Sequence, residues 1–372
     1  MRLDNNQQAF FALVRAGLWA DLESTDIRIQ GFTEPVNWDK IYQLAEEQSV
    51  LGVVLAGLEH SNVKPPQDQL LQWIGEVQMI EQENLAMNKF VAQLIEELRK
   101  NDINALLVKG QGTAQCYEEP LWRCSGDVDL LVAANAYQKG KIYLTAKADS
   151  VDPEYTAESH LSMMIKDYVV ELHGSMHTRL SKRIDSYIDN VQDEIFKKQK
   201  VRSWKNGETE VFLPAPDEDV IFVFTHIIKH FFLEGIGLRQ ICDWCRLLWT
   251  YRSELDLRLL ESRMTGMGLM SEWKAFGAFA VNYLSMPCDA MPFYDPRYKA
   301  KGEGILAFIL ETGNFGHNRE IDYSGNYLCR KIQSAWRKLN DFGQHAMIFP
   351  LDSVKFFFHF MGEGIGNAVR GE

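Results

Sequence analysis

The stretch Gly126-Asp127-Val128-Asp129-Leu130-Leu131-Val132 decides how the fold of this chain is interpreted. Its acidic and apolar residues alternate and then give way to an apolar run, which predicts a β-strand with side chains projecting alternately to opposite faces. Asp127 and Asp129 therefore lie on one face. Two neighbouring carboxylates repel each other and are costly to bury unless a cation lies between them. Because hard oxygen ligands suit Mg²⁺, the stretch predicts a divalent-metal site.

The surrounding sequence supports a buried strand over an exposed one whose aspartates simply point to water. Residues 130–132 are apolar on both faces, as in a strand covered on both sides. Upstream, the apolar run 105–108 ends at Lys109-Gly110 and predicts a strand that leads into a helix. Downstream, Tyr168-Val169-Val170-Glu171-Leu172-His173 predicts a further strand, on which Glu171 and His173 share a face. Glu171 is either a third site carboxylate or an exposed acid on an edge strand.

Taken together, these motifs resemble the DNA polymerase β-like nucleotidyltransferase superfamily, and more narrowly its uncharacterised bacterial nucleotidyltransferases. The resemblance covers residues 100–180 and extends more weakly to Arg239 and Asp243. It implies an α+β fold, in which a small mixed-sheet core of the polymerase β type is flanked by N- and C-terminal helical regions. We expect a helical region at 1–100, the nucleotidyltransferase core at 101–215 and a helical domain at 216–372.

The resemblance also implies a reaction, the transfer of NMP from an NTP to an acceptor with loss of pyrophosphate. The catalytic and metal-binding residues would then be Asp127, Asp129 and Glu171, with Mg²⁺ or Mn²⁺ as the cofactor. By its position, Glu171 would help to deprotonate the attacking hydroxyl. The candidate nucleotide contacts are Lys109, Gly110, Gln111, Arg123, Gly126 and His173.

One departure from the superfamily pattern leaves the phosphate contacts open. The usual Gly-Ser or Gly-Gly pair is replaced here by Lys109-Gly110-Gln111-Gly112. Gly110 would let phosphate approach main-chain N–H groups. Lys109 either supplies charge to the phosphates or is a surface lysine at a strand end. Arg123 either neutralises triphosphate oxygens or forms an ion pair that orients a neighbouring acid. His173 either contacts substrate or fills the site wall.

A second motif, Cys242-Asp243-Trp244-Cys245, suggests a Cys₂His₂ metal site together with His226 and His230. The two cysteines fall within a predicted amphipathic helix at 238–251, and the two histidines fall within another at 219–233. Buried core cysteines are therefore the expected outcome. A long amphipathic helix is also predicted from Trp73 to Leu98, with Asn84 as the one break in its apolar stripe.

The composition of the chain limits the kinds of partner that it is expected to bind. The chain has 372 residues, 46% of them hydrophobic, and a net charge of −12, which argues against a broad footprint for duplex nucleic acid. A small-molecule or protein acceptor is accordingly favoured over RNA. No apolar run approaches the ~20 residues that span a bilayer, and the N-terminus lacks the apolar core of a secretory signal. A cytoplasmic protein without a membrane partner is the expectation.

Two other functions compete with this enzyme. The fold could serve as a catalytically inactive module that binds nucleotide or a partner protein. A kinase-like phosphotransferase also needs carboxylate-bound Mg²⁺, but its loop motifs are missing from the sequence. Two aspartates and a plausible third acid favour the nucleotidyltransferase.

Overall fold

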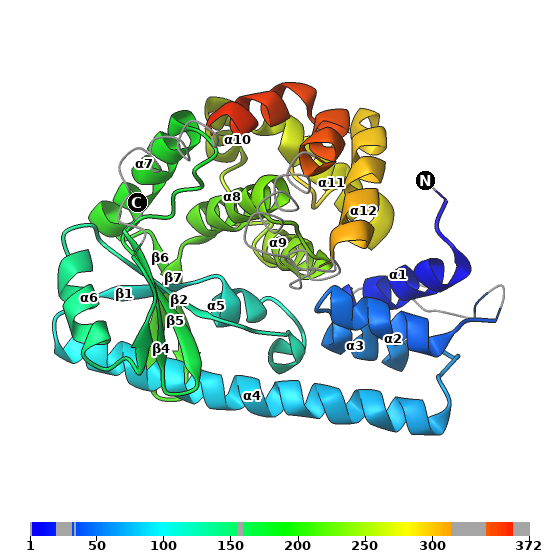
Figure 1. Ribbon diagram of the computed structural model, residues 1–372, viewed down its shortest axis with the longest axis horizontal. Helices are drawn as coiled ribbons and strands as arrows, with labels where there is room; N and C mark the ends of the chain where they lie inside the picture. Colours follow the sequence, from blue (N-terminus) through cyan, green and yellow to red (C-terminus); the bar gives the residue numbers. More distant parts are fainter. Residues whose placement is uncertain (1, 20–31, 33–34, 155–158, 314–339, 360–372) are drawn as a thin grey trace, which may run out of the picture.

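The computed structural model describes residues 2–19, 32, 35–154, 159–313 and 340–359. Its first part is helical, with the elements α1 (Asn5–Leu18), α2 (Trp38–Glu47), α3 (Leu51–Glu59) and α4 (Gln67–Lys100). Helix α4 connects the two ends of the molecule, with α1–α3 at one end and the sheet at the other (Figure 1). Most of its predicted apolar stripe is buried, from Trp73 to Leu98. The polar residue within that stripe, Asn84, is buried as well.

A five-stranded mixed sheet follows, in the order β1-β2-β5-β4-β3. Strand β2 pairs in parallel with β5, and the other neighbours pair antiparallel. The α+β fold with a mixed sheet and helical flanks is therefore confirmed. The strand bounds are β1 (Ala105–Val108), β2 (Val128–Val132), β3 (Ser150–Val151), β4 (His160–Ile165) and β5 (Tyr168–His173).

The register of the sheet positions the site. All residues of β1 and β2 are buried, as expected for strands that are apolar on both faces. Strands β4 and β5 form a hairpin, with a two-residue turn at 166–167. Across the parallel pair, Asp129 lies beside Glu171. The two acids that the sequence places on separate strands are therefore neighbours in the sheet.

Further elements surround the sheet, namely α5 (Gly110–Ala114), η1 (Pro120–Trp122), α6 (Tyr137–Thr145), α7 (Lys182–Lys198), β6 (Val201–Asn206) and β7 (Thr209–Pro214). Strands β6 and β7 form a second hairpin with a two-residue turn at 207–208, because β6 continues to Asn206 and pairs with Thr209. This second hairpin packs through β7 against β1 and α4.

The C-terminal part is a helical layer, made of α8 (Pro216–Leu233), α9 (Leu238–Thr250), α10 (Leu257–Met267), α11 (Met270–Leu284), η3 (Pro296–Tyr298) and α12 (Lys299–Thr312). Residues 340–348 and 350–359 are also helical. Helices α8 and α9 lie between the sheet and the outer helices (Figure 1). None of the described helices combines the length and the hydropathy needed to cross a membrane.

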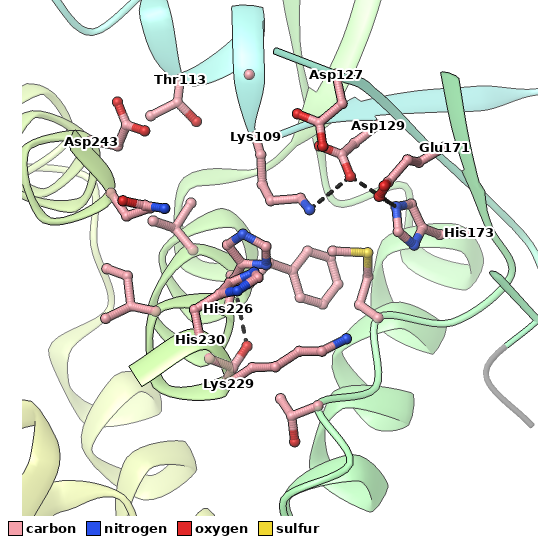
Figure 2. Close-up of a pocket in the computed structure, with 18 of the residues that line it drawn as sticks. Lys109, Thr113, Asp127, Asp129, Glu171, His173, His226, Lys229, His230 and Asp243 are labelled. Carbon is pink, nitrogen blue, oxygen red and sulfur yellow. Dashed lines mark hydrogen bonds and ion pairs between the residues drawn. The ribbon is translucent and has the colours of Figure 1, made fainter. Parts of the chain in front are cut away.

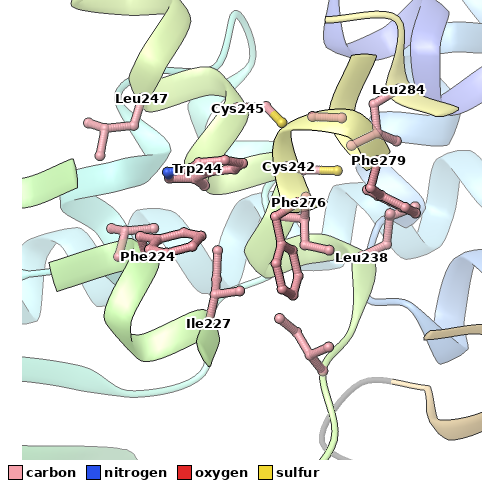
Figure 3. Packing of buried hydrophobic residues seen from close by; sticks show 14 of the residues in the cluster. Phe224, Ile227, Leu238, Cys242, Trp244, Cys245, Leu247, Phe276, Phe279 and Leu284 are labelled. Atoms are coloured by element: carbon pink, nitrogen blue, oxygen red, sulfur yellow. The ribbon is translucent and has the colours of Figure 1, made fainter. Parts of the chain in front are cut away.

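Aromatic and sulfur-containing side chains fill the core of this helical layer. Phe224, Trp244 and Phe276 pack around α9, and Cys242 and Cys245 point into the same cluster (Figure 3). Both cysteines are fully buried, as predicted. The aromatic sequence at 353–368 predicts packing on this helical layer, and the structure describes it as far as residue 359. Within that part Phe356 is buried and Phe358 is exposed.

Candidate active site

Three carboxylates converge where β2 and β5 lie side by side. Asp127 immediately precedes β2, Asp129 is within it, and Glu171 is the neighbour of Asp129 on β5. One oxygen from each carboxylate lies within 4.8 Å of the others, a spacing that a bound cation can bridge. Figure 2 shows the three side chains turned toward one another at one side of a cavity. Asp129 is the most deeply placed, with 2% of its surface exposed.

Lys109 balances only part of the negative charge of the three carboxylates. Repulsion from Asp129 and burial both raise the pKa of Asp127, and Lys109 offsets only part of that rise. A carboxylate whose charged form is disfavoured in this way is better accommodated when a cation is added. The donor set therefore fits a divalent metal with a preference for oxygen ligands.

Lys109 reaches the cluster because of an unusual turn at the end of β1. Its backbone has φ +57° and ψ −146°, and the next residue, Gly110, has φ +42°. A positive φ is costly for a residue with a side chain, so this conformation indicates a constrained loop. The turn brings the Lys109 Nζ to 2.7 Å from Asp129 Oδ1. Burial lowers the pKa of Lys109, but attraction to the three carboxylates outweighs it and the net shift is upward.

Two histidines flank Glu171. The Nε2 atom of His173 lies 2.8 Å from Asp129 Oδ1 and 3.4 Å from Glu171 Oε2, and the Nε2 atom of His160 lies 3.3 Å from that same Glu171 oxygen. Burial raises the pKa of Glu171, but its contacts with the two histidines outweigh burial and lower it. Burial lowers the pKa of His173, but hydrogen bonding to Asp129 and Glu171 outweighs burial, and the net shift is upward. The site therefore holds Glu171 in its ionised form.

His160, Glu171 and His173 also form a second set of metal-type donors, with atoms within 4.8 Å of one another. The two imidazole rings are stacked, with centroids 4.6 Å apart and planes inclined by 3°. A metal ion bound to a histidine nitrogen lies close to the plane of that ring. Two stacked parallel rings cannot satisfy this for one ion in this arrangement, so we interpret the pair as a support for Glu171.

Arg123 lies at the edge of the cavity, and Asp243 on α9 holds its guanidinium. Its Nε and Nη2 atoms donate to the two oxygens of Asp243 at 2.8 and 2.7 Å. Tyr117 donates a third hydrogen bond to the same carboxylate at 2.9 Å. Of the two interpretations of Arg123, the structure shows the ion pair. Its partner is Asp243 on the helical layer, whereas the sequence had suggested Asp127 or an acid near it.

Gln111 does not reach the cavity, in contrast to its predicted contact with nucleotide. Its side chain is buried on the far side of α5, and its Nε2 donates to Asn84 Oδ1 at 3.2 Å. Asn84 in turn donates to the carbonyl oxygens of Leu121 and Arg123 at 2.7 and 2.8 Å. The polar break in the α4 stripe therefore anchors the loop that carries Arg123 and leads to Asp127.

Replacing Asn84 with leucine is expected to destabilise the protein and loosen this loop. Leucine has a similar size but removes the hydrogen bonds of Asn84 to the carbonyl groups of Leu121 and Arg123 and to Gln111, and a buried group left unsatisfied costs about 1–3 kcal/mol. We expect a loss of at least ~2 kcal/mol in the free energy of unfolding, measured by urea denaturation. Met87→Leu, at a buried apolar position of α4, is the control and should cost under ~1.5 kcal/mol. Equal losses in the two variants would contradict the anchoring role.

The carboxylates border a cavity of about 310 Å³. Lys109, Gly110, Gly126 and His173 line it from the sheet side, and α8 and α9 line it from the other. On α8 the ring of His226 packs edge-to-face on His230, with centroids 4.2 Å apart, and His230 Nδ1 lies 2.7 Å from Glu234 Oε2. The structure thus separates the four residues of the Cys₂His₂ motif. The cysteines belong to the core, and the histidines face the cavity.

Three site residues escaped the sequence interpretation in part or in full. His160 faces His173 across the β4–β5 hairpin, a pairing that follows once the hairpin register is known. The sequence suggests His226 only as a ligand in the Cys₂His₂ motif, and it suggests Lys229 only weakly, as a contact to nucleotide or acceptor. The spacing of His226, Lys229 and His230 places these three residues on one face of α8, and that spacing is the signal that could have identified His226 and Lys229.

Comparison with known proteins identifies a family. A family model described as uncharacterised nucleotidyltransferase matches residues 34–281, two thirds of the chain. No curated protein matches. Among solved structures, the chain is similar to an antigenic nucleotidyltransferase-like protein from Paracoccidioides brasiliensis at 12% identity, covering 55% of this chain and 93% of that one with a TM-score of 0.32. This structural likeness is too distant to inform the site. On the strength of the family match, the chain belongs to the uncharacterised nucleotidyltransferases.

Proposed function

We propose that the protein transfers NMP from an NTP to an acceptor hydroxyl with the help of a divalent metal ion. The acceptor oxygen forms a bond to the α-phosphorus, and the bond from that phosphorus to the bridging oxygen breaks to release pyrophosphate. The observation that carries the proposal is the convergence of Asp127, Asp129 and Glu171 at one side of a cavity, in a chain of a nucleotidyltransferase family.

Asp127, Asp129 and Glu171 would hold Mg²⁺ or Mn²⁺. When bound, such an ion supplies positive charge that stabilises the developing charge on the attacking and leaving oxygens. Gly110 and Gly126 line the cavity and leave room for the nucleotide beside the carboxylates. An added Cβ on Gly110 would lie 3.5 Å from the carbonyl oxygen of Asp127, in a backbone conformation that side chains rarely adopt.

Glu171 has a more specific task in this proposal. Because His160 and His173 lower its pKa, Glu171 is ionised and accepts a hydrogen bond from the attacking hydroxyl. The same lowered pKa makes it a weak final proton acceptor, so the proton passes on to water. Glu171 therefore orients the acceptor and ligates the metal, and Asp127 and Asp129 serve mainly as ligands.

The acceptor is proposed to be a small molecule or a protein. With a net charge of −12, the chain as a whole repels the phosphate backbone of RNA. We also propose that the chain divides into a helical region at 1–100, the catalytic core at 101–215 and a helical domain at 216–372. The alternative, an inactive module on the same fold, would keep the cavity without turnover.

An assay with four NTPs tests the proposal. Each NTP, labelled at the α-phosphate, is incubated with Mg²⁺ or Mn²⁺ in cell lysate together with wild type or with Asp127→Ala/Asp129→Ala. Transfer of label to an acceptor by wild type alone is the expected result, and it identifies the base and the acceptor class. If no label moves and calorimetry detects no binding of any NTP, the nucleotidyltransferase proposal is contradicted.

A further inference from the structure

The side of the cavity opposite the carboxylates carries several basic side chains and one acid, Glu234, which pairs with His230. Helix α8 contributes His226, Lys229 and His230, which are spaced three and four residues apart and therefore share one face. In Figure 2, His226 lies between Lys109 and His230, and the side chain of Lys229 extends along the side away from Asp127 and Asp129. One end of the cavity is thus suited to a cation, and the other end to an anion.

The groups predicted from the sequence to hold phosphate are engaged elsewhere. Lys109 pairs with Asp129 at 2.7 Å, and Arg123 pairs with Asp243 at the same distance. Gln111 points away from the cavity and bonds to Asn84. The loop at residues 109–112 therefore offers little side-chain contact to the phosphates beyond the α-phosphate. Other basic groups that line the cavity are Arg239 on α9 and the residues on the cavity face of α8.

The electrostatics of α8 point to the same conclusion. Burial lowers the pKa of His226 well below its ordinary value, and the positive charges of Lys109, His230 and Lys229 lower it further. Cationic groups gathered around one imidazole disfavour its protonation, and an anion placed among them would relieve that repulsion. This mirrors the carboxylate cluster, where repulsion between acids favours a cation.

We propose that Lys229 and His226 bind the β- and γ-phosphates of the nucleotide. This assignment rests on the proposed function and specifies the substrate contacts of the same cavity. The Lys229 ammonium and the ring N–H of His226 donate hydrogen bonds to phosphate oxygens, while the α-phosphate lies at the carboxylate end. The face of α8 thereby replaces the side-chain contacts of the Gly-Ser pair that this chain lacks.

Calorimetry with three probes in Mg²⁺ buffer tests the assignment. The probes are inorganic tripolyphosphate, the NTP that wild type binds most tightly, and the corresponding NMP. Lys229→Met should weaken the binding of tripolyphosphate and NTP by about tenfold to a hundredfold, because a charge-assisted contact is lost. NMP binding should stay within about twofold. His226→Gln, which removes the imidazole, should weaken the same two probes by at least about threefold.

Lys197→Met is the matched control, since it removes the same charge from an exposed position on α7 where 72% of the side chain is accessible. Thermal unfolding of each variant establishes that it is folded. If Lys229→Met binds tripolyphosphate as tightly as Lys197→Met does, the assignment is overturned while the proposed function stands. If wild type binds neither NTP nor tripolyphosphate, the assignment and the proposed function both fail.

Discussion

Asp127→Asn is expected to abolish nucleotidyl transfer and at the same time to stabilise the metal-free fold. The transfer rate should fall at least about a thousandfold, since a bound metal contributes several kcal/mol to the transition state and each ~1.4 kcal/mol is a factor of ten. Stability should rise because the substitution removes the negative charge, and with it the repulsion from Asp129 and the cost of burying that charge, which together raise the pKa of this carboxyl. Loss of activity with a gain in melting temperature is unusual for a buried polar substitution.

The pH dependence of that gain has a definite sign. An acid whose pKa is raised on folding destabilises the protein above its folded pKa, and the penalty disappears below the pKa of the unfolded chain. The advantage of Asp127→Asn should therefore be largest near neutral pH and vanish below about pH 4. Asp193→Asn, at an exposed site on α7, should change stability by less than ~0.5 kcal/mol.

Added Mn²⁺ supplies a second comparison. The ion should raise the melting temperature of wild type, because anything that binds the folded state alone stabilises it, and it should have a much smaller effect on Asp127→Asn. An Asp127→Asn protein that is less stable than wild type without metal would contradict the account of repulsion between the carboxylates.

Arg123→Met is expected to cost about 3–5 kcal/mol of folding stability, the typical penalty for breaking a buried ion pair by removal of one partner. The side chains of Arg123 and Asp243 are only 6% and 8% exposed. The substitution therefore leaves the buried carboxylate of Asp243 without its ion pair, although Tyr117 still donates a hydrogen bond to it. Because the pair joins the loop before Asp127 to α9, NTP binding should weaken as well. Urea denaturation measures the first effect and calorimetry the second.

Two further variants sharpen this prediction. Arg297 forms an ion pair with Asp295 at the same 2.7 Å, but its side chain is 84% exposed, so Arg297→Met should change stability far less than Arg123→Met. The double variant Arg123→Met/Asp243→Leu should regain much of the lost stability, since it removes both charges. If Arg123→Met costs no more than Arg297→Met, the pair does not connect the core to the helical layer as described.

Local sequence patterns were enough to predict the strands that carry the acids and the faces on which the acids lie. Alternation at 126–132 and 168–173 determines which faces Asp127, Asp129 and Glu171 occupy, because the strand period does not depend on distant contacts. The family resemblance implied that the strands carrying Asp129 and Glu171 are adjacent, since no local pattern determines which strands pair. The parallel direction of that pair comes from the structure alone.

Contacts between distant segments could not be predicted in the same way. Arg123 and Asp243 are 120 residues apart, and their pairing depends on how α9 packs beside η1. The direction of Gln111 depends on the two consecutive positive φ angles at Lys109 and Gly110, which rotate α5. Likewise, His226 reaches the cavity only because the opposite face of α8 is buried in the aromatic core.

A paired-label experiment tests the central claim most directly. The preferred NTP is supplied in two forms, labelled at the α-phosphate or at the γ-phosphate, and incubated with the purified protein, its acceptor and Mn²⁺. The account predicts that the α-label moves to the acceptor, that the γ-label leaves as pyrophosphate, and that Asp127→Asn does neither. Transfer of the γ-label to the acceptor would instead reveal a phosphotransferase and contradict the assignment of these carboxylates to nucleotidyl transfer.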